Sequence, residues 1–132
     1  NTEKAARKLA EKLQAKGASV ILRNLATTEV SFAVAEAFYC GKMILASATY
    51  DSFLFPPMEE FLTHLKTKAF QKRKVGLIEN GTWAPTAARQ MKTKLEELKD
   101  IKLCDTVVTI KSALNAASEA QMDKLVDEIL AD

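Results

Sequence analysis

The chain has 132 residues, of which 48% are hydrophobic and 27% charged, and its formal net charge is +2. These values predict one globular domain with one hydrophobic core. The small net charge gives no reason to expect nucleic acid or an anionic membrane as a partner. No apolar run approaches the ~20 residues of a membrane span, and no Cys, His and carboxylate cluster has metal-ligand spacing.

Helices and strands are expected to alternate along the chain. Apolar residues at helical spacing predict that Asn1-Thr2 opens directly onto a helix, which ends at a C-cap glycine, Gly17. Residues 18–25 predict a strand, and an alanine-rich apolar helix is expected over residues 29–38, closely packed against its neighbours. The clearest strand covers residues 42–47, which are apolar after the first position, as in buried parallel strands.

The second half continues this alternation. The expected elements are a helix over 56–65, a strand over 74–79, a helix over 85–99, a strand over 103–110 and a last helix over 118–130. Pro56 and Pro57 suit the first turn of their helix, because no N–H is needed there. Ser118 is expected to cap the last helix, with Gln121 completing a capping box.

Alternating strands and helices predict a doubly wound parallel sheet with helices on both faces. The sequence opens on a helix, where this class expects a strand, and in the strand order 2-1-3-4-5 the first strand is central. We therefore expect residues 1–132 to be a single α/β domain that lacks its first strand. Residues 18–25 would then lose a neighbour and leave an open edge that favours dimerisation or aggregation.

Two polar, aromatic-bearing loops follow buried strands, where open α/β sheets bind ligands. Their candidate residues are Thr49, Tyr50, Asp51, Asn80, Gly81, Thr82 and Trp83. Tyr50 and Trp83 can supply aromatic faces for a flat ring. Backbone groups of the loops can form hydrogen bonds with the polar edge of that ring. Asn1 and Thr2 begin a helix, and a helix N-terminus offers free N–H groups and partial positive charge to a phosphate.

Each of these features also has a purely structural interpretation. Thr2 could act only as a helix cap, and Asn80-Gly81 could form only a turn. Tyr50 and Trp83 could be packing residues or contacts to a partner protein. The prediction of a ligand site therefore depends on all of these features occurring together and in this order.

The same stretches resemble a known family. Asn1-Thr2-Glu3-Lys4 resembles the end of the phosphate loop of flavodoxin-like domains, commonly written T-x-G-N-T-E. Ser47-Ala48-Thr49-Tyr50-Asp51, followed by Leu54-Phe55-Pro56-Pro57, looks like the second flavin loop of the flavodiiron (A-type flavoprotein) family. Asn80-Gly81-Thr82-Trp83 looks like the third flavin loop of that family. The resemblance covers nearly the whole chain, in order and spacing.

The resemblance implies a flavodoxin-like domain that binds FMN and transfers electrons, truncated before Asn1 and so lacking most of the phosphate loop. The implied FMN-binding residues are Asn1, Thr2, Thr49, Tyr50, Asp51, Asn80, Gly81, Thr82 and Trp83. Asp51 stands where the family often has an uncharged residue, and a charge near the ring is expected to lower the reduction potential of the flavin. The redox chemistry itself belongs to the cofactor.

The same resemblance implies partners. Electrons would come from a rubredoxin-type or NAD(P)H-dependent reductase donor and pass to a diiron domain. In the family, the flavin of one subunit faces the diiron centre of another, so the intact protein is expected to be a homodimer, located in the cytoplasm. The diiron centre lies in a separate domain, and this chain is expected to hold no complete catalytic site.

Two other interpretations remain open. Receiver domains of response regulators share the topology and use an Asp, a Thr or Ser and a Lys, which Asp51, Thr82 and Lys111 match loosely. Asp51, however, lies several residues past its strand, and receivers do not need two loop aromatics. The chain could also be a flavin-free structural or dimerisation module. Phosphorylation by acetyl phosphate with Mg²⁺ would favour the receiver, and a yellow protein the flavin interpretation.

Overall fold

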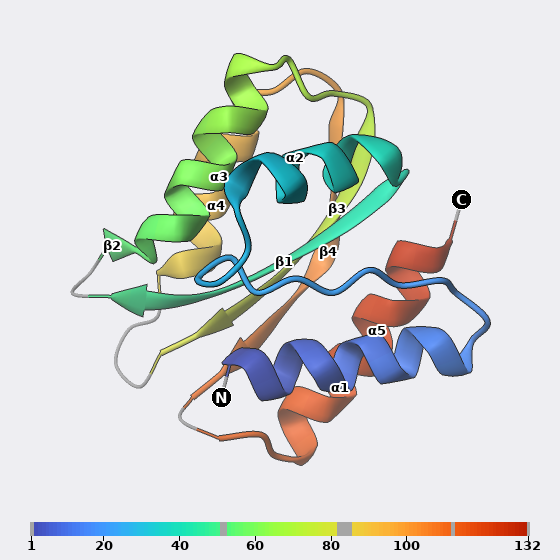
Figure 1. Ribbon diagram of the computed structural model, residues 1–132. Helices are drawn as coiled ribbons and strands as arrows, with labels where there is room; N and C mark the ends of the chain where they lie inside the picture. Colours follow the sequence, from blue (N-terminus) through green and yellow to red (C-terminus); the bar gives the residue numbers. More distant parts are fainter. Residues whose placement is uncertain (1, 51–52, 82–85, 112, 132) are drawn as a thin grey trace.

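The computed structural model describes residues 2–50, 53–81, 86–111 and 113–131, and its centre is a β-sheet in the order β2-β1-β3-β4 (Figure 1). The strands are β1 (Lys42–Tyr50), β2 (Phe53–Leu54), β3 (Arg73–Asn80) and β4 (Ile101–Ile110). β1, β3 and β4 run parallel, and β2 pairs antiparallel with the end of β1. The predicted parallel sheet is confirmed, and the short strand β2 was not predicted.

Helices cover both faces of this sheet, as predicted. They are α1 (Thr2–Ala15), α2 (Val30–Tyr39), α3 (Pro56–Thr67), α4 (Ala87–Leu95) and α5 (Ala116–Leu130). One hydrophobic cluster packs α2, α3 and α4 against the sheet, and a second packs α1 and α5 against the opposite face. The two clusters bury the apolar stripes of these helices and the apolar residues of β3.

The predicted C-cap of α1 is confirmed. Gly17 has φ +91°, and its N–H donates to Gln14 O at 2.9 Å, while Ala18 N–H donates to Leu13 O at 3.1 Å. This pattern of two bonds around a left-handed residue is a Schellman motif. Helix α3 ends in the same motif, but its left-handed residue is Ala69, at φ +58°.

Replacing Ala69 with glycine is expected to stabilise the fold by about 0.5–1 kcal/mol, because glycine adopts positive φ without the Cβ strain. Urea unfolding followed by circular dichroism measures this difference. Gly17→Ala is the reverse control and should lower the free energy of unfolding. Equal stabilities for Ala69→Gly and the unsubstituted chain would contradict the prediction.

The predicted cap of the last helix is wrong by three residues. Asn115, not Ser118, is the N-cap: its side chain accepts from Ser118 N at 2.9 Å, and Ser118 Oγ accepts from Asn115 N at 2.9 Å. Ser118 therefore stands at the third helical position of a capping box in which serine replaces the usual Glu or Gln. Gln121 instead accepts from Thr109 N on β4 at 2.9 Å.

Two other predictions differ from the structure. Residues 18–24 form neither helix nor strand, because no described strand lies beside them and a strand needs a pairing partner. Ala18 and Val20 pack against the α1–α5 cluster and Leu25 against the other one, so this segment passes from one face to the other (Figure 1). Helix α2 is also less closely packed than expected, since Phe32 is 63% and Tyr39 85% exposed.

The two edges of the sheet are treated differently. At β4, side chains of α5 occupy outward-facing amides: Glu128 Oε1 accepts from Thr106 N and Gln121 Oε1 from Thr109 N, each at 2.9 Å. At β1, residues 42–48 pair with residues 74–80 of β3, and no described strand pairs with their other edge. The side chains of α5 therefore hide the β4 edge from other chains, whereas the β1 edge has no such cap among the described residues.

Acid should weaken the attachment of α5 to β4. Hydrogen bonds from the hydroxyl and then the amide of Thr106 hold the pKa of Glu128 below its ordinary value of 4.5. Since the folded-state pKa is the lower one, this stabilisation is present above about pH 4.5 and is lost as the pH falls through the folded-state pKa. Glu128→Gln should therefore flatten the pH dependence of unfolding free energy below about pH 4.5. Urea unfolding between pH 3 and 7 tests this, and parallel curves would contradict it.

Among the described residues, no helix is long and apolar enough to cross a membrane.

Candidate site at the carboxyl ends of the strands

The carboxyl ends of the three parallel strands lie at one edge of the sheet, where the N-terminus of α1 also arrives (Figure 1). Asn80, the last residue of β3, donates from Nδ2 to Thr2 Oγ at 3.2 Å. The next residue, Gly81, donates its N–H to Ile110 O at the end of β4 at 3.0 Å. The structure therefore brings together Thr2, Asn80 and Gly81, three of the predicted site residues.

Thr49 lies one residue before the end of β1 at this edge, and its hydroxyl faces α4. Its Oγ accepts from Thr86 N at 3.0 Å and from Ala87 N at 3.1 Å. The Thr49 hydroxyl thus caps α4. It takes the place of the N-cap residue Thr86, whose own side chain makes no capping hydrogen bond. The role predicted for Thr49 involved its backbone groups, and that role stays a prediction.

Glu79 is a polar residue of this edge that was not predicted. Its Oε1 accepts from Ala88 N at 3.1 Å, and its Oε2 accepts from Thr109 Oγ at 2.9 Å. A carboxylate suits the first turn of a helix, where the N–H groups carry partial positive charge. The one sequence signal was a glutamate at the end of a buried strand, shortly before a helix.

The side chains of the remaining predicted residues are not among those that the structure describes. Asn1, Asp51, Thr82 and Trp83 lie outside the described residues. Tyr50 is described through its backbone, which ends β1 and pairs with Phe53 of β2. Their predicted contacts with a ligand therefore stay predictions.

The N-termini of two helices, α1 and α4, lie at this edge. At α4, the amides of the N-cap residue Thr86 and of the first two helical residues, Ala87 and Ala88, already donate to Thr49 and Glu79. The start of a helix favours an anion, and at this edge Thr2 begins α1 beside the side-chain amide of Asn80. Glu3 in that first turn forms an exposed ion pair with Arg7 at 2.8 Å.

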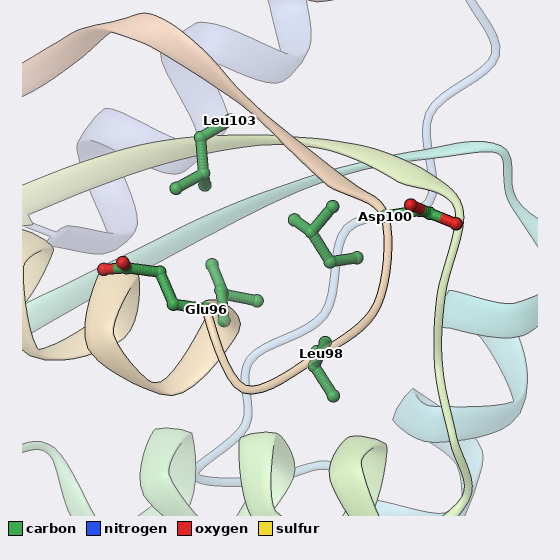
Figure 2. Close-up of a pocket in the computed structure, with 6 residues that line it drawn as sticks. Glu96, Leu98, Asp100 and Leu103 are labelled. Atoms are coloured by element: carbon green, nitrogen blue, oxygen red, sulfur yellow. The ribbon is translucent and has the colours of Figure 1, made fainter.

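Two hollows lie elsewhere on the described surface. One, of about 280 Å³, is formed between the end of α4 and the start of β4, and Figure 2 shows the carboxylates of Glu96 and Asp100 on its opposite sides. The other, of about 670 Å³, lies between α2 and the segment before it, beside the Arg23–Glu36 ion pair. Neither hollow is lined by a predicted site residue, and the two carboxylates of the first do not converge on one point.

Comparison with solved structures finds the same fold, whereas no family model and no curated protein matches the sequence. A solved structure of a rubredoxin oxygen:oxidoreductase from the anaerobe Desulfovibrio gigas superposes on 97% of the chain with a TM-score of 0.90 and 23% identity. The fold is flavodoxin-like. The chain spans 32% of the length of that protein.

Two flavodoxin structures share this flavodoxin-like fold over almost their whole length. Oxidised flavodoxin 1 from Bacillus cereus has a TM-score of 0.82 and 15% identity, over 98% of this chain and 89% of its own. Two-electron reduced flavodoxin from Megasphaera elsdenii has a TM-score of 0.71 and 19% identity, over 96% of this chain and 89% of its own. At these identities the likeness establishes the fold, and the function has to be argued from the site.

Proposed function

We propose that this chain is a flavin-binding electron-transfer domain that holds FMN at the carboxyl edge of its sheet. The observation that carries the proposal is the hydrogen bond between Asn80 Nδ2 and Thr2 Oγ. Thr2 begins the helix whose N-terminus is proposed to bind the phosphate, and Asn80 is one of the residues proposed to bind the ring, so this bond supports one shared site. The likeness to oxidised and two-electron reduced flavodoxins supports the same class of function.

In this proposal the residues divide the cofactor between them. The amides at the start of α1, with Asn1 and Thr2, bind the phosphate. Tyr50 and Trp83 contribute aromatic faces, while backbone groups of Thr49 and of residues 80–82 bond the polar edge of the ring. The bound flavin supplies one- and two-electron redox chemistry, and the protein orients it and tunes its potential.

We also propose partners for the intact protein. A rubredoxin-type or NAD(P)H-dependent reductase would donate the electrons, and a diiron domain in a cytoplasmic homodimer would accept them. The D. gigas protein, whose name joins rubredoxin to an oxygen:oxidoreductase and of which this fold forms about a third, is the finding that supports this pairing.

Anaerobic titration with FMN, followed by tryptophan fluorescence, tests the cofactor proposal. Trp83 is the single tryptophan, so the signal reports on one predicted site residue. We expect saturable quenching, and weaker binding of riboflavin, which has no phosphate to bind at α1. Unchanged fluorescence at saturating FMN, with no change in the flavin spectrum, would contradict the proposal.

Asp51→Asn is expected to raise the reduction potential of the bound flavin by tens of millivolts, because the carboxylate disfavours the anionic reduced ring. An anaerobic redox titration against indicator dyes measures the shift. Glu60→Gln, which removes an exposed charge within α3, is the control and should leave the potential unchanged. A potential that stays the same in Asp51→Asn would show that this charge does not act on the ring.

We further propose that residues 1–132 are part of a larger flavodoxin-like domain, and that a strand from upstream residues fills the open edge of β1. Two observations support this. β1 is as apolar as a central strand, yet Met43, Ile44 and Ala46 are only partly buried, whereas Val75, Leu77 and Ile78 of β3 are buried. Segment 18–24, which contains the exposed Ile21 and Leu22, also pairs with no described strand.

Hydrogen exchange tests this second proposal. The amides of residues 43–48 that point away from β3 should exchange fast in the 132-residue chain. They should become protected in a longer chain that includes the natural upstream residues, which should also bind FMN more tightly. Protection in a dimer of the 132-residue chain, unchanged by the extension, would mean that a second copy covers the edge and would contradict the proposal.

A further inference from the structure

Helix α2 carries apolar side chains on nearly all of its sides. Ala33 and Val34 are buried against the sheet, whereas Phe32 is 63% and Tyr39 85% exposed. These two values are the highest among the exposed large hydrophobic residues of the described chain. A helix that is apolar all round is normally covered all round. The outward side of α2 therefore has the character of a contact surface.

The exposed residues of α2 share one side of the helix. Phe32, Ala35 and Tyr39 stand at positions i, i+3 and i+7, which lie on one helical face, and Ala35 is exposed between the two rings. Glu36 is the one charged residue of α2. Its carboxylate accepts two hydrogen bonds from the guanidinium of Arg23, each at 2.8 Å. Because this charge already has its partner within the chain, covering it costs less than covering a lone carboxylate.

The hollow between α2 and the segment before it adjoins this side of the helix. It has a volume of about 670 Å³, and its lining includes the apolar Phe32 and Ala35 and the polar Thr27, Thr28 and Glu29. Pockets of roughly 300–1,000 Å³ hold small ligands in proteins, so the hollow has room for an aromatic side chain. A phenol suits such a lining, because its ring is apolar and its hydroxyl needs a hydrogen-bond partner when buried.

The same helix carries an exposed phenol outside the hollow. Tyr39 does not line the hollow and stands four residues after Ala35 and seven after Phe32. At 1.5 Å per residue, Tyr39 lies about 8 Å along the axis from the middle of that pair. If two α2 helices pair antiparallel about a two-fold axis near Glu36, the Tyr39 of each copy stands level with the hollow of the other. A two-fold contact of this kind is self-complementary and fills both hollows at once.

We propose that α2 is the surface through which two copies of this chain associate, with Tyr39 of each copy in the hollow beside Phe32 and Ala35 of the other. Two aromatic side chains, each able to bury about 150–250 Å², amount to less than the ~800 Å² per partner of a standard interface. The dimer is therefore weak, with a Kd above about 1 μM. It needs neither flavin nor a diiron domain, so a chain that fails to bind FMN can still form it.

Sedimentation velocity of the 132-residue chain between about 1 μM and 1 mM tests the association. We expect the sedimentation coefficient to rise from the monomer value towards that of a dimer. Tyr39→Ala should weaken the dimer at least about tenfold, and Ala35→Arg, which puts a long charged side chain into the hollow, should abolish it. Leu22→Ala is the matched control, because Leu22 is 44% exposed but does not line the hollow; it should leave the Kd unchanged. All three positions are exposed, so the variants should keep the fold, which circular dichroism checks.

Disulfide trapping tests the antiparallel arrangement. Phe32→Cys and Tyr39→Cys are made in separate chains whose two free cysteines, Cys40 and Cys104, are replaced by serine. In the proposed dimer, position 32 of one copy faces position 39 of the other. Equivalent positions lie about 9–12 Å apart along the axis, beyond the roughly 7 Å that a disulfide allows between Cα atoms. An equal mixture of the two chains should therefore form the mixed disulfide several times more than either symmetric one.

Three results would overturn the proposal. The first is a chain that stays monomeric up to about 1 mM. The second is a dimer whose Kd is the same with Tyr39→Ala and Ala35→Arg, because the copies would then associate through another surface, such as the open edge of β1. The third is a mixture in which the symmetric disulfides predominate, since this would exclude an antiparallel pair of α2 helices.

Discussion

Replacing Phe70 with alanine is expected to lower the free energy of unfolding by about 4 kcal/mol, because it leaves a large cavity in a packed core. Phe70 is 1% exposed and follows α3 in the Schellman motif of that helix. Its ring meets Phe38 edge-on, with the centroids 5.2 Å apart, and the Arg73 guanidinium lies 5.2 Å from its centroid. Alanine loses the burial and both ring contacts, while the backbone bond to Leu65 O can persist.

Urea unfolding followed by circular dichroism measures this loss. Phe32→Ala is the control, since Phe32 is 63% exposed, and it should change the free energy of unfolding by less than about 0.5 kcal/mol. Similar losses for the two variants would mean that the ring of Phe70 is not packed as described.

Leu125→Ala is expected to cost about 3 kcal/mol, because this fully buried leucine of α5 fills the space above Gly76. A Cβ built on Gly76 would stand 2.9 Å from Leu125 Cδ1 and 3.4 Å from Ile44 Cγ1. Glycine at the centre of β3 is therefore what lets the helix approach the sheet so closely. Removing the leucine leaves a cavity beside Gly76, which has no side chain of its own to fill it.

The effect of Gly76→Ala on stability should change sign when Leu125 is replaced, and urea unfolding of the unsubstituted protein, the two single variants and the double variant measures this. Gly76→Ala alone should destabilise by about 1–3 kcal/mol, because Leu125 must move within a packed core. In the Leu125→Ala background, Gly76→Ala should stabilise, because the new methyl group enters the cavity and the clash is gone. Additive effects of the two substitutions would show that the two side chains do not share this space.

The sheet was predictable from sequence, because its strands are apolar runs bounded by polar residues. β1, β3 and β4 were each located to within a few residues on that basis. Residues 18–25 have the same apolar character but form no strand. Pairing depends on a neighbour that can lie anywhere in a chain, and a local sequence pattern does not contain that information. The cap of α5 was misplaced because Asn115 and Ser118 can each begin a helix, and only the structure shows which one does.

The candidate site was predictable in outline and not in its contacts. Parallel strands place their ends together, which is why the predicted Thr2, Asn80 and Gly81 lie at one edge. The cap of α4 was missed because Glu79 bonds to partners 9 and 30 residues away, and Thr49 to partners 37 and 38 away. Helix capping rules consider only the adjacent residues, so they left these side chains without a structural role.

The difference between the two sheet edges also limits how copies of the chain can associate. A sheet with two open edges can add strands indefinitely and grow into a fibre. Here α5 occupies outward amides of β4, and the edge without a described partner is that of β1. Two copies that pair through β1 would use the same surface on each and leave no free edge, which is the closed two-fold arrangement. Pairing of the 132-residue chain through this edge would therefore stop at the dimer, and the upstream strand proposed above would prevent it.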